Sequence, residues 1–278
     1  MTTRSMPTNN TAEHDENNWT AILLAGQRPA GDPLANIFGV KHKALIKIAD
    51  KTMLRRVADT LLGSPKISRV VIIAQSPNEL IVDDTTALAE NDRVAFIQGN
   101  DGIATSIASV AGTAAAPWPV LVTTADNALL TPEIVNYFLS ENTDNDLSVG
   151  VVERALMMKH YPETKRTWLK FKGGAYSGAN LFAFKNSTAN KALTLWSSIE
   201  QDRKKSWKIM SRFGPWLLLR AVTRTITFEN AMRKAGKQLS IRAQPVVLPF
   251  AEAAIDVDKP DDLELATEIL LKRQSDHR

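Results

Sequence analysis

Short apolar runs alternate with helical patterns through the first half of the chain, and this alternation restricts the fold more than any other feature. The apolar runs lie at residues 19–25, 70–74, 94–97 and 120–124. The segments 52–63 and 103–115 between them have helical apolar spacing. Strands that are apolar at nearly every position are typical of a parallel sheet covered on both faces. The sequence therefore predicts an α/β fold, a single-domain three-layer α/β/α structure with a mostly parallel central sheet.

No internal repeat and no Gly/Ser-rich linker divides the chain, so we expect one folded domain over residues 19–274. Residues 1–18 are polar, and we expect a disordered tail there without a secretion signal. No apolar stretch reaches the roughly 18–20 residues that a bilayer span needs. The chain has no cysteine, which excludes disulfides, thiolate metal ligands and cysteine nucleophiles. These features favour a cytoplasmic protein.

Polar or glycine residues follow each predicted strand, where ligands of open α/β sheets bind. Leu24-Ala25-Gly26 ends the first strand. A glycine there lets the backbone approach a ligand closely, and amides in such a turn can cradle phosphate oxygens. An ordinary turn from strand to loop has the same sequence. Lys43, after a long loop, can supply a positive charge to a polyphosphate or can simply be solvated.

The third strand is followed by Gly99-Asn100-Asp101-Gly102 and then a helix that carries Ser106. The Asn100 and Ser106 side chains can hydrogen-bond the edge of a nucleobase. Asn100 or Asp101 can equally be the N-cap of the helix. The sequence leaves both interpretations open.

Three acids can serve as ligands of a divalent cation. Asp126 follows the fourth strand, and a carboxylate at the tip of a buried strand can bind a cation through oxygen. Asp256 and Asp258 lie two residues apart near the last helix, so that in a strand their carboxylates face the same way. Two such charges repel unless a cation neutralises them, although solvated turn acids remain the alternative.

Four stretches in this order resemble the MobA-like NTP transferases, a nucleotidyltransferase superfamily with a GT-A-like fold. They are LLAGQRP, KALIKIADKTMLRRV, TTADNALLTPE and AIDVDKPDDLELA. The resemblance covers roughly residues 19–152 and 240–272. It implies that the Leu24-Ala25-Gly26 loop cradles a triphosphate and that Lys43 binds phosphate. It also implies that Gly99, Asn100 and Ser106 contact the base.

The resemblance further implies Mg²⁺ as cofactor, bound by Asp126 together with Asp258 or Asp256. The family usually has a second glycine where Gln27 stands, with an arginine a few residues later. Here the loop is longer and Arg28 comes early, which argues against a role in molybdenum cofactor synthesis. Arg28 is the candidate that would assist Lys43 in offsetting phosphate charge.

The activity implied is transfer of a nucleoside monophosphate from an NTP to a phosphorylated small molecule or lipid precursor, with release of pyrophosphate. CTP is favoured because GNDGIATS resembles the base loop of cytidylyltransferases. One alternative is a GT-A-type glycosyltransferase that uses a sugar nucleotide. The other is a regulatory module that binds nucleotide without catalysis.

A basic segment interrupts the second half of the chain, and we expect a helical insertion at about 203–236. Arg203 to Phe228 contains seven Lys or Arg and no acid. Over residues 203–224 these cations mix with tryptophan, phenylalanine and leucine, a composition that suits peripheral contact with an anionic membrane. The alternative is that the apolar side chains pack on the sheet while the cations stay in water. The net charge is only +4, so no nucleic acid partner is expected.

Overall fold

The computed structural model describes residues 18–27, 31–142, 144–201 and 215–276. The predicted tail at 1–18 therefore lies outside the described residues except for Asn18. Arg28 and residues 203–214 of the basic segment also lie outside the described residues.

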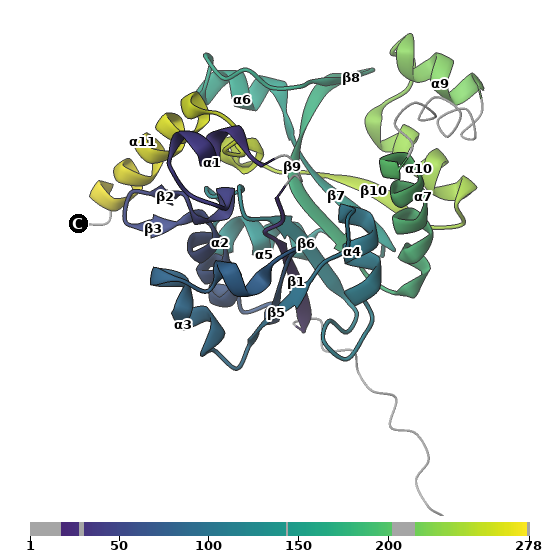
Figure 1. Ribbon diagram of the computed structural model, residues 1–278. Coiled ribbons are helices and arrows are strands. Elements are labelled where there is room, and N and C mark those ends of the chain that lie inside the picture. Colours follow the sequence, from purple (N-terminus) through teal and green to yellow (C-terminus); the bar gives the residue numbers. More distant parts are fainter. Residues whose placement is uncertain (1–17, 28–30, 143, 202–214, 277–278) are drawn as a thin grey trace, which may run out of the picture.

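A mostly parallel sheet forms the centre of the molecule (Figure 1). Its strands follow the order β10-β7-β9-β6-β1-β4-β5, and β8 pairs with β9 at one side of this path. The pairs β10–β7, β6–β1, β1–β4 and β4–β5 are parallel, and β9 runs antiparallel to its neighbours. A separate antiparallel pair joins β2 to β3.

The strands are β1 (Trp19–Leu24), β2 (Lys47–Ile48), β3 (Lys51–Thr52), β4 (Ile67–Ala74), β5 (Val94–Gln98), β6 (Val120–Thr124), β7 (Leu147–Glu153), β8 (Leu169–Phe171), β9 (Gly174–Phe184) and β10 (Ala243–Val247). The α-helices are α1 (Pro33–Ile37), α2 (Met53–Gly63), α3 (Thr86–Ala89), α4 (Ile103–Val110), α5 (Pro132–Ser140), α6 (Arg154–His160), α7 (Asn190–Gln201), α9 (Pro215–Val222), α10 (Phe228–Gln238) and α11 (Pro260–Asp276). Short 3₁₀ helices are η1 (Lys43–Leu45), η2 (Pro77–Leu80), η3 (Asp83–Thr85), η4 (Ser187–Ala189) and η6 (Ala251–Ala254).

Helices cover both faces of the sheet, as the continuous apolar strands predict. Ala21 and Leu23 of β1 point into a core shared with α2, α5 and α11, whereas Ile22 between them points to α4 and α7. Successive residues of a strand face opposite sides, so a strand buried on both sides is apolar throughout. The predicted three-layer α/β/α fold is confirmed, and Figure 1 shows α2 and α4 on different sides of the sheet.

Local sequence determines where α5 begins. Thr131 is its N-cap and accepts a hydrogen bond from Ile134 N at 3.3 Å, and Pro132 occupies the first turn. A threonine cap followed by proline satisfies or removes amides that have no partner inside the helix. This helix follows β6 and the Asp126 loop, so its fixed start helps to fix that loop.

The segment before α11 does not form the strand in which Asp256 and Asp258 would face the same way. Residues 251–254 form η6, and no strand is present from Ile255 to Asp258. The two acids of this segment therefore do not share a face: the Asp258 carboxylate contacts Lys43, and the Asp256 carboxylate contacts Arg166. Contacts with the Lys43 and Arg166 side chains, rather than the alternation of a strand, decide where each carboxylate points.

None of the helices in the described ranges is long and apolar enough to cross a membrane. Within the predicted insertion at about 203–236, the described residues form α9 and most of α10. The division of the chain into a tail, one domain and an insertion remains a prediction.

Candidate active site

The carboxyl ends of β1, β4, β5 and β6 meet at one edge of the sheet, and backbone hydrogen bonds join the segments that follow them. Ala25 N donates to Ile73 O at 2.9 Å, and Ala125 N donates to Leu24 O at 2.9 Å. Gly99 N donates to Ala74 O at 2.8 Å. These bonds extend the ladder by one residue beyond each strand and bring the three loops side by side.

A cavity of about 710 Å³ lies at this edge. Eight of the candidate ligand-binding residues from the sequence line it: Leu24, Ala25, Gly26, Lys43, Gly99, Ser106, Asp126 and Asp258. The cavity is large enough to hold a nucleotide, because small-molecule sites typically measure about 300–1,000 Å³.

Lys43 connects the two acids that line the cavity. Its ammonium donates to Asp126 Oδ2 at 2.8 Å and to Asp258 Oδ1. The Thr124 hydroxyl donates to the other oxygen of Asp126 at 2.5 Å. Val257 N donates to the backbone carbonyl of Asp126 at 3.0 Å, which holds the segment before α11 against the end of β6.

Surrounding charges keep Lys43 protonated. Its side chain is only 13% exposed, and burial alone would lower its pKa. The carboxylates of Asp126 and then Asp258 outweigh burial and raise the pKa above the usual value. Lys43 begins η1, whose neighbour His42 pairs through Nε2 with Glu79 Oε2 at 2.7 Å. That pair ties the lysine-bearing loop to η2.

Asp256 lies outside the cavity lining and is bound by Arg166. The Arg166 guanidinium contacts the Asp256 carboxylate and lies 3.0 Å from Asp262 Oδ1. Asn180 Nδ2 donates to Asp256 Oδ2 at 3.4 Å. Burial raises the pKa of Asp256, Arg166 opposes this, and the acids Asp258 and Asp126 raise it further.

The backbone at Gly26 is approached closely by a polar side chain. A Cβ atom at Gly26 would lie 3.0 Å from Gln75 Oε1, which also accepts a hydrogen bond from Gln27 N at 2.9 Å. The space beside the glycine thus holds a flexible amide rather than packed apolar groups. Gln75 follows β4 directly, so the rule that selects residues after strands could have found it.

The loop from Gly99 to Ser106 is held by its own hydrogen bonds. Ser106 Oγ accepts from Asn100 N at 2.9 Å and donates to Gly102 O at 2.6 Å. The side-chain Nδ2 of Asn100 donates to Thr105 O at 3.3 Å. Asn100 is not among the residues that line the cavity. A Cβ atom at Gly99 would lie 2.8 Å from Ile73 Cγ2, so packing requires glycine there.

Glu200 is a cavity residue that the sequence does not reveal. It comes from the end of α7, and its carboxylate accepts from Ile103 N at 2.9 Å and Ala104 N at 3.1 Å. These are the first amides of α4, which have no partner within the helix. Only the packing of α7 against α4 brings this acid to the cavity, and no local sequence pattern indicates it.

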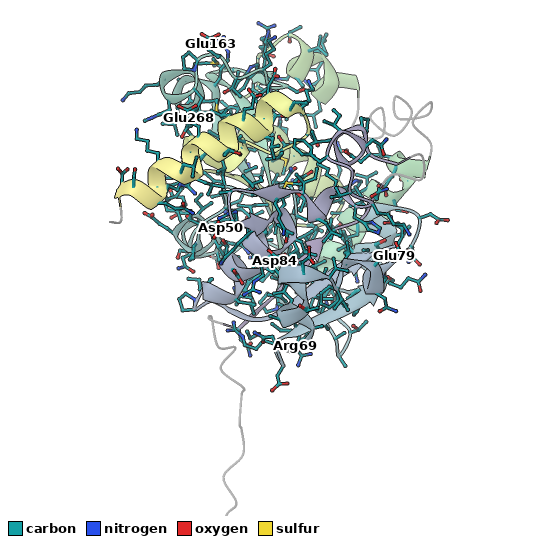
Figure 2. The ribbon with its side chains drawn as sticks, turned by 60° about the vertical axis from the view of Figure 1, so that its left-hand side comes forward. Asp50, Arg69, Glu79, Asp84, Glu163 and Glu268 are labelled. Atoms are coloured by element: carbon teal, nitrogen blue, oxygen red, sulfur yellow. The ribbon has the colours of Figure 1, made fainter. Side chains whose placement is uncertain are left out.

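A second hollow of about 810 Å³ lies between α11 and the segment that follows α6. Figure 2 shows Glu268 on α11 in the foreground and Glu163 above it, and both residues line this hollow. Its charges are mixed, and Arg273 is paired with Glu252 at 2.8 Å. None of the residues that follow β1, β4, β5 or β6 lines it, so the cavity at the sheet edge is the better candidate site.

The donor set of this cavity suits a hard divalent cation. Asp126 and Asp258 already share one cation, the Lys43 ammonium. Among the residues described, no group of three or more His, Asp or Glu side chains is arranged to bind a metal. Mg²⁺ commonly binds through one or two carboxylates and completes its shell with water and substrate phosphates. Two carboxylates beside a space for a triphosphate fit that requirement.

A mostly parallel sheet with a cavity beyond the carboxyl ends of its strands, lined by an ammonium and two carboxylates, is the arrangement in which open α/β proteins bind ligands. The sequence pattern of the MobA-like NTP transferase domain matches residues 21–197. The chain therefore belongs to the MobA-like NTP transferase family and is a nucleotidyltransferase.

Solved structures share this fold. A hypothetical transferase from Thermus thermophilus has a TM-score of 0.74 and 25% identity, covering 88% of this chain and 99% of its own. A 4-diphosphocytidyl-2C-methyl-D-erythritol synthase from Anaerococcus prevotii has a TM-score of 0.56 and 11% identity, covering 92% and 100%. CMP:2-keto-3-deoxy-manno-octonic acid synthetase complexed with CTP has a TM-score of 0.52 and 13% identity, covering 92% and 99%. A search of curated protein sequences gives no match.

Proposed function

We propose that the chain is a Mg²⁺-dependent enzyme that transfers a nucleoside monophosphate from an NTP, with CTP favoured, to a phosphorylated small molecule or lipid precursor. The observation that supports this most directly is the cluster of Lys43, Asp126 and Asp258 beside the loop after β1, all within one cavity. Amide groups, one ammonium and two acids are the groups that binding of a triphosphate–metal complex requires.

In the proposed reaction, a phosphate oxygen of the acceptor attacks the α-phosphorus of the NTP. The bond from the α-phosphorus to the oxygen that bridges to the β-phosphate breaks, and pyrophosphate leaves with that electron pair. An acceptor phosphate is already ionised at neutral pH, so no general base is required. The protein contributes position and charge neutralisation.

Each group of the cavity has a role in this proposal. The backbone at Leu24, Ala25 and Gly26 cradles the triphosphate, and Lys43 neutralises charge on the α-phosphate and the leaving group. Arg28, which lies outside the described residues, is proposed as a second cation there. Mg²⁺ held by Asp126 and Asp258 would neutralise charge on the phosphate oxygens and hold the triphosphate in place.

The loop that carries Gly99, Asn100 and Ser106 is proposed to bind the base. CTP is favoured by the resemblance of this loop to that of cytidylyltransferases. One of the proteins that share the fold was solved with CTP. The Asn100 side chain and the Ser106 hydroxyl are both held by hydrogen bonds within the loop, so in this proposal the two residues shape the loop and its backbone contacts the base.

A screen of the four NTPs against phosphorylated alcohols and sugars, with Mg²⁺ and pyrophosphate as the readout, tests the proposal. We expect one NTP and acceptor to release pyrophosphate, and Asp126→Asn to abolish the release. Asp261→Asn, an exposed acid in the first turn of α11, is the matched control. Consumption of a sugar nucleotide instead would favour a glycosyltransferase. Nucleotide binding without turnover, unchanged in Asp126→Asn, would favour a regulatory module.

A further inference from the structure

Helix α9 exposes an apolar face. Trp216 is 69% exposed, Leu219 50% and Val222 75%. Their spacing of three residues places them along one side of the helix. Leu169 of the adjacent strand β8 is 48% exposed, and Figure 1 shows α9 at the periphery near β8. We refer to Trp216, Leu219, Val222 and Leu169 as the α9 surface.

The exposed fractions show that the α9 surface faces outward rather than into a core. Contacts of the chain after α9 fix this segment to the body of the protein. Phe228 of α10 stacks on Phe171 of β8, with ring centroids 4.8 Å apart. Lys172 N donates to Ile226 O at 3.0 Å. The alternative that the apolar residues of this segment pack on the sheet does not hold for Trp216, which is largely exposed.

Exposed cations lie on the segments next to the α9 surface, and Glu229 in the first turn of α10 is an exposed acid. Lys170 and Lys172 are exposed on the β8–β9 hairpin, and Arg224 is exposed after the end of α9. The described residues 215–228 contain no acid. An apolar helix face with cations beside it is the composition that binds the interface of an anionic bilayer. Two copies of the same surface would instead bring like charges together, which disfavours a symmetric dimer.

We propose that the α9 surface docks on an anionic membrane, with its apolar side chains at the acyl boundary and the surrounding cations at the lipid headgroups. Docking does not depend on the proposed nucleotidyl transfer. Where both hold, the acceptor that the enzyme meets is a phosphorylated lipid precursor in that membrane.

Sedimentation of the full chain with vesicles tests the proposal. We expect binding to vesicles of phosphatidylcholine with an equal share of phosphatidylglycerol, little binding to phosphatidylcholine alone, and release as salt rises. The triple variant Trp216→Ser, Leu219→Ser, Val222→Ser should bind the anionic vesicles at least about tenfold more weakly. The control variant Val247→Ser, Leu271→Ser removes exposed apolar residues of β10 and α11 and should bind like wild type.

A second variant does not depend on the fold of α9. Lys170→Gln together with Lys172→Gln should weaken binding to the anionic vesicles and reduce its salt dependence, while circular dichroism and thermal unfolding stay unchanged. The proposal is overturned if wild type does not bind the anionic vesicles, or if the serine variant binds them equally. It is also overturned if light scattering shows a dimer that the serine variant dissociates while vesicle binding is absent.

Discussion

The Lys43 ammonium lies 2.8 Å from Asp126 Oδ2 and also contacts Asp258, so a single lysine occupies the space between the two acids of the cavity. A divalent cation bound to both acids must take over that space. Among the described residues, Lys43 is the one lysine or arginine that lines the cavity where a triphosphate is proposed to bind. Metal binding and release of Lys43 toward phosphate are therefore expected to be linked.

Replacement of this lysine should have opposite effects on metal affinity and on turnover. Lys43→Met removes a positive charge from between the acids, so we expect Mn²⁺ to bind about tenfold more tightly without nucleotide. Turnover should fall on the order of 10²-fold, because charge on the leaving group is no longer neutralised. Electron paramagnetic resonance of free Mn²⁺ measures the first effect. Lys47→Met, an exposed lysine of β2, is the control, and equal Mn²⁺ affinity in wild type and Lys43→Met would contradict the expectation.

The three acids should separate into two functional groups. Asp126→Asn and Asp258→Asn should each weaken Mn²⁺ binding, because both carboxylates line the cavity. Asp256→Asn should fold like wild type and leave Mn²⁺ binding nearly unchanged, because this carboxylate lies outside the cavity lining and is bound by Arg166. Mn²⁺ titration and urea unfolding of all three variants measure this. Loss of metal affinity in Asp256→Asn, with affinity retained in Asp258→Asn, would reverse the assignment.

Two glycines of the cavity should respond differently to alanine. In Gly99→Ala the new Cβ would lie 2.8 Å from Ile73 Cγ2, so we expect a loss of about 1–3 kcal/mol in unfolding free energy. In Gly26→Ala the nearest atom belongs to the flexible Gln75 side chain, so stability should change little. NTP affinity should still fall in Gly26→Ala, because the methyl group displaces the Gln75 side chain, which binds Gln27 N in the loop that is proposed to cradle the triphosphate. Urea unfolding and equilibrium NTP binding separate the two effects, and equal destabilisation of both variants would be inconsistent with this packing.

The sequence predicts the cavity residues that follow strands, because parallel strands bring their carboxyl ends to one edge whatever their separation in the chain. Leu24, Gly99 and Asp126 were found in this way, and Lys43 through the family resemblance. Glu200 was missed because it reaches the cavity through packing of α7 on α4, which no local pattern encodes. The prediction that the carboxylates of Asp256 and Asp258 face the same way is wrong, because it assumed a strand where the chain forms η6 and a loop.

Glu200 should affect nucleotide affinity more than turnover. Its carboxylate binds the first two amides of α4, beside the loop that is proposed to hold the base. In Glu200→Ala these amides lose their acceptor and the loop loses its tie to α7, so KM for the NTP should rise several-fold to about tenfold with kcat nearly constant. Glu200→Gln, which keeps one acceptor oxygen, should recover part of the affinity. Glu264→Ala on exposed α11 surface is the control, and a lower KM in Glu200→Ala would mean that the carboxylate competes with the nucleotide.

Asp146 should make stability depend on pH in the acidic range. This acid precedes β7 and accepts from Arg242 N at 2.8 Å and from Asn186 Nδ2 at 3.0 Å. Burial alone would raise its pKa, yet these two donors bind the ionised form and hold the pKa below its ordinary value of 3.8. A depressed pKa in the folded state contributes stability above 3.8 that is lost as pH falls through the folded-state value.

Asp146→Asn should therefore lower the free energy of unfolding by about 1–3 kcal/mol at neutral pH. The difference from wild type should shrink as pH falls below the ordinary carboxyl pKa, because wild type then loses the charge that the variant lacks. Urea unfolding at a series of pH values measures this, with Asp144→Asn, an exposed acid of the same loop, as the control. A difference that stays constant down to about pH 2 would show that the ionised carboxylate of Asp146 stabilises the folded state no more than the protonated carboxyl group does.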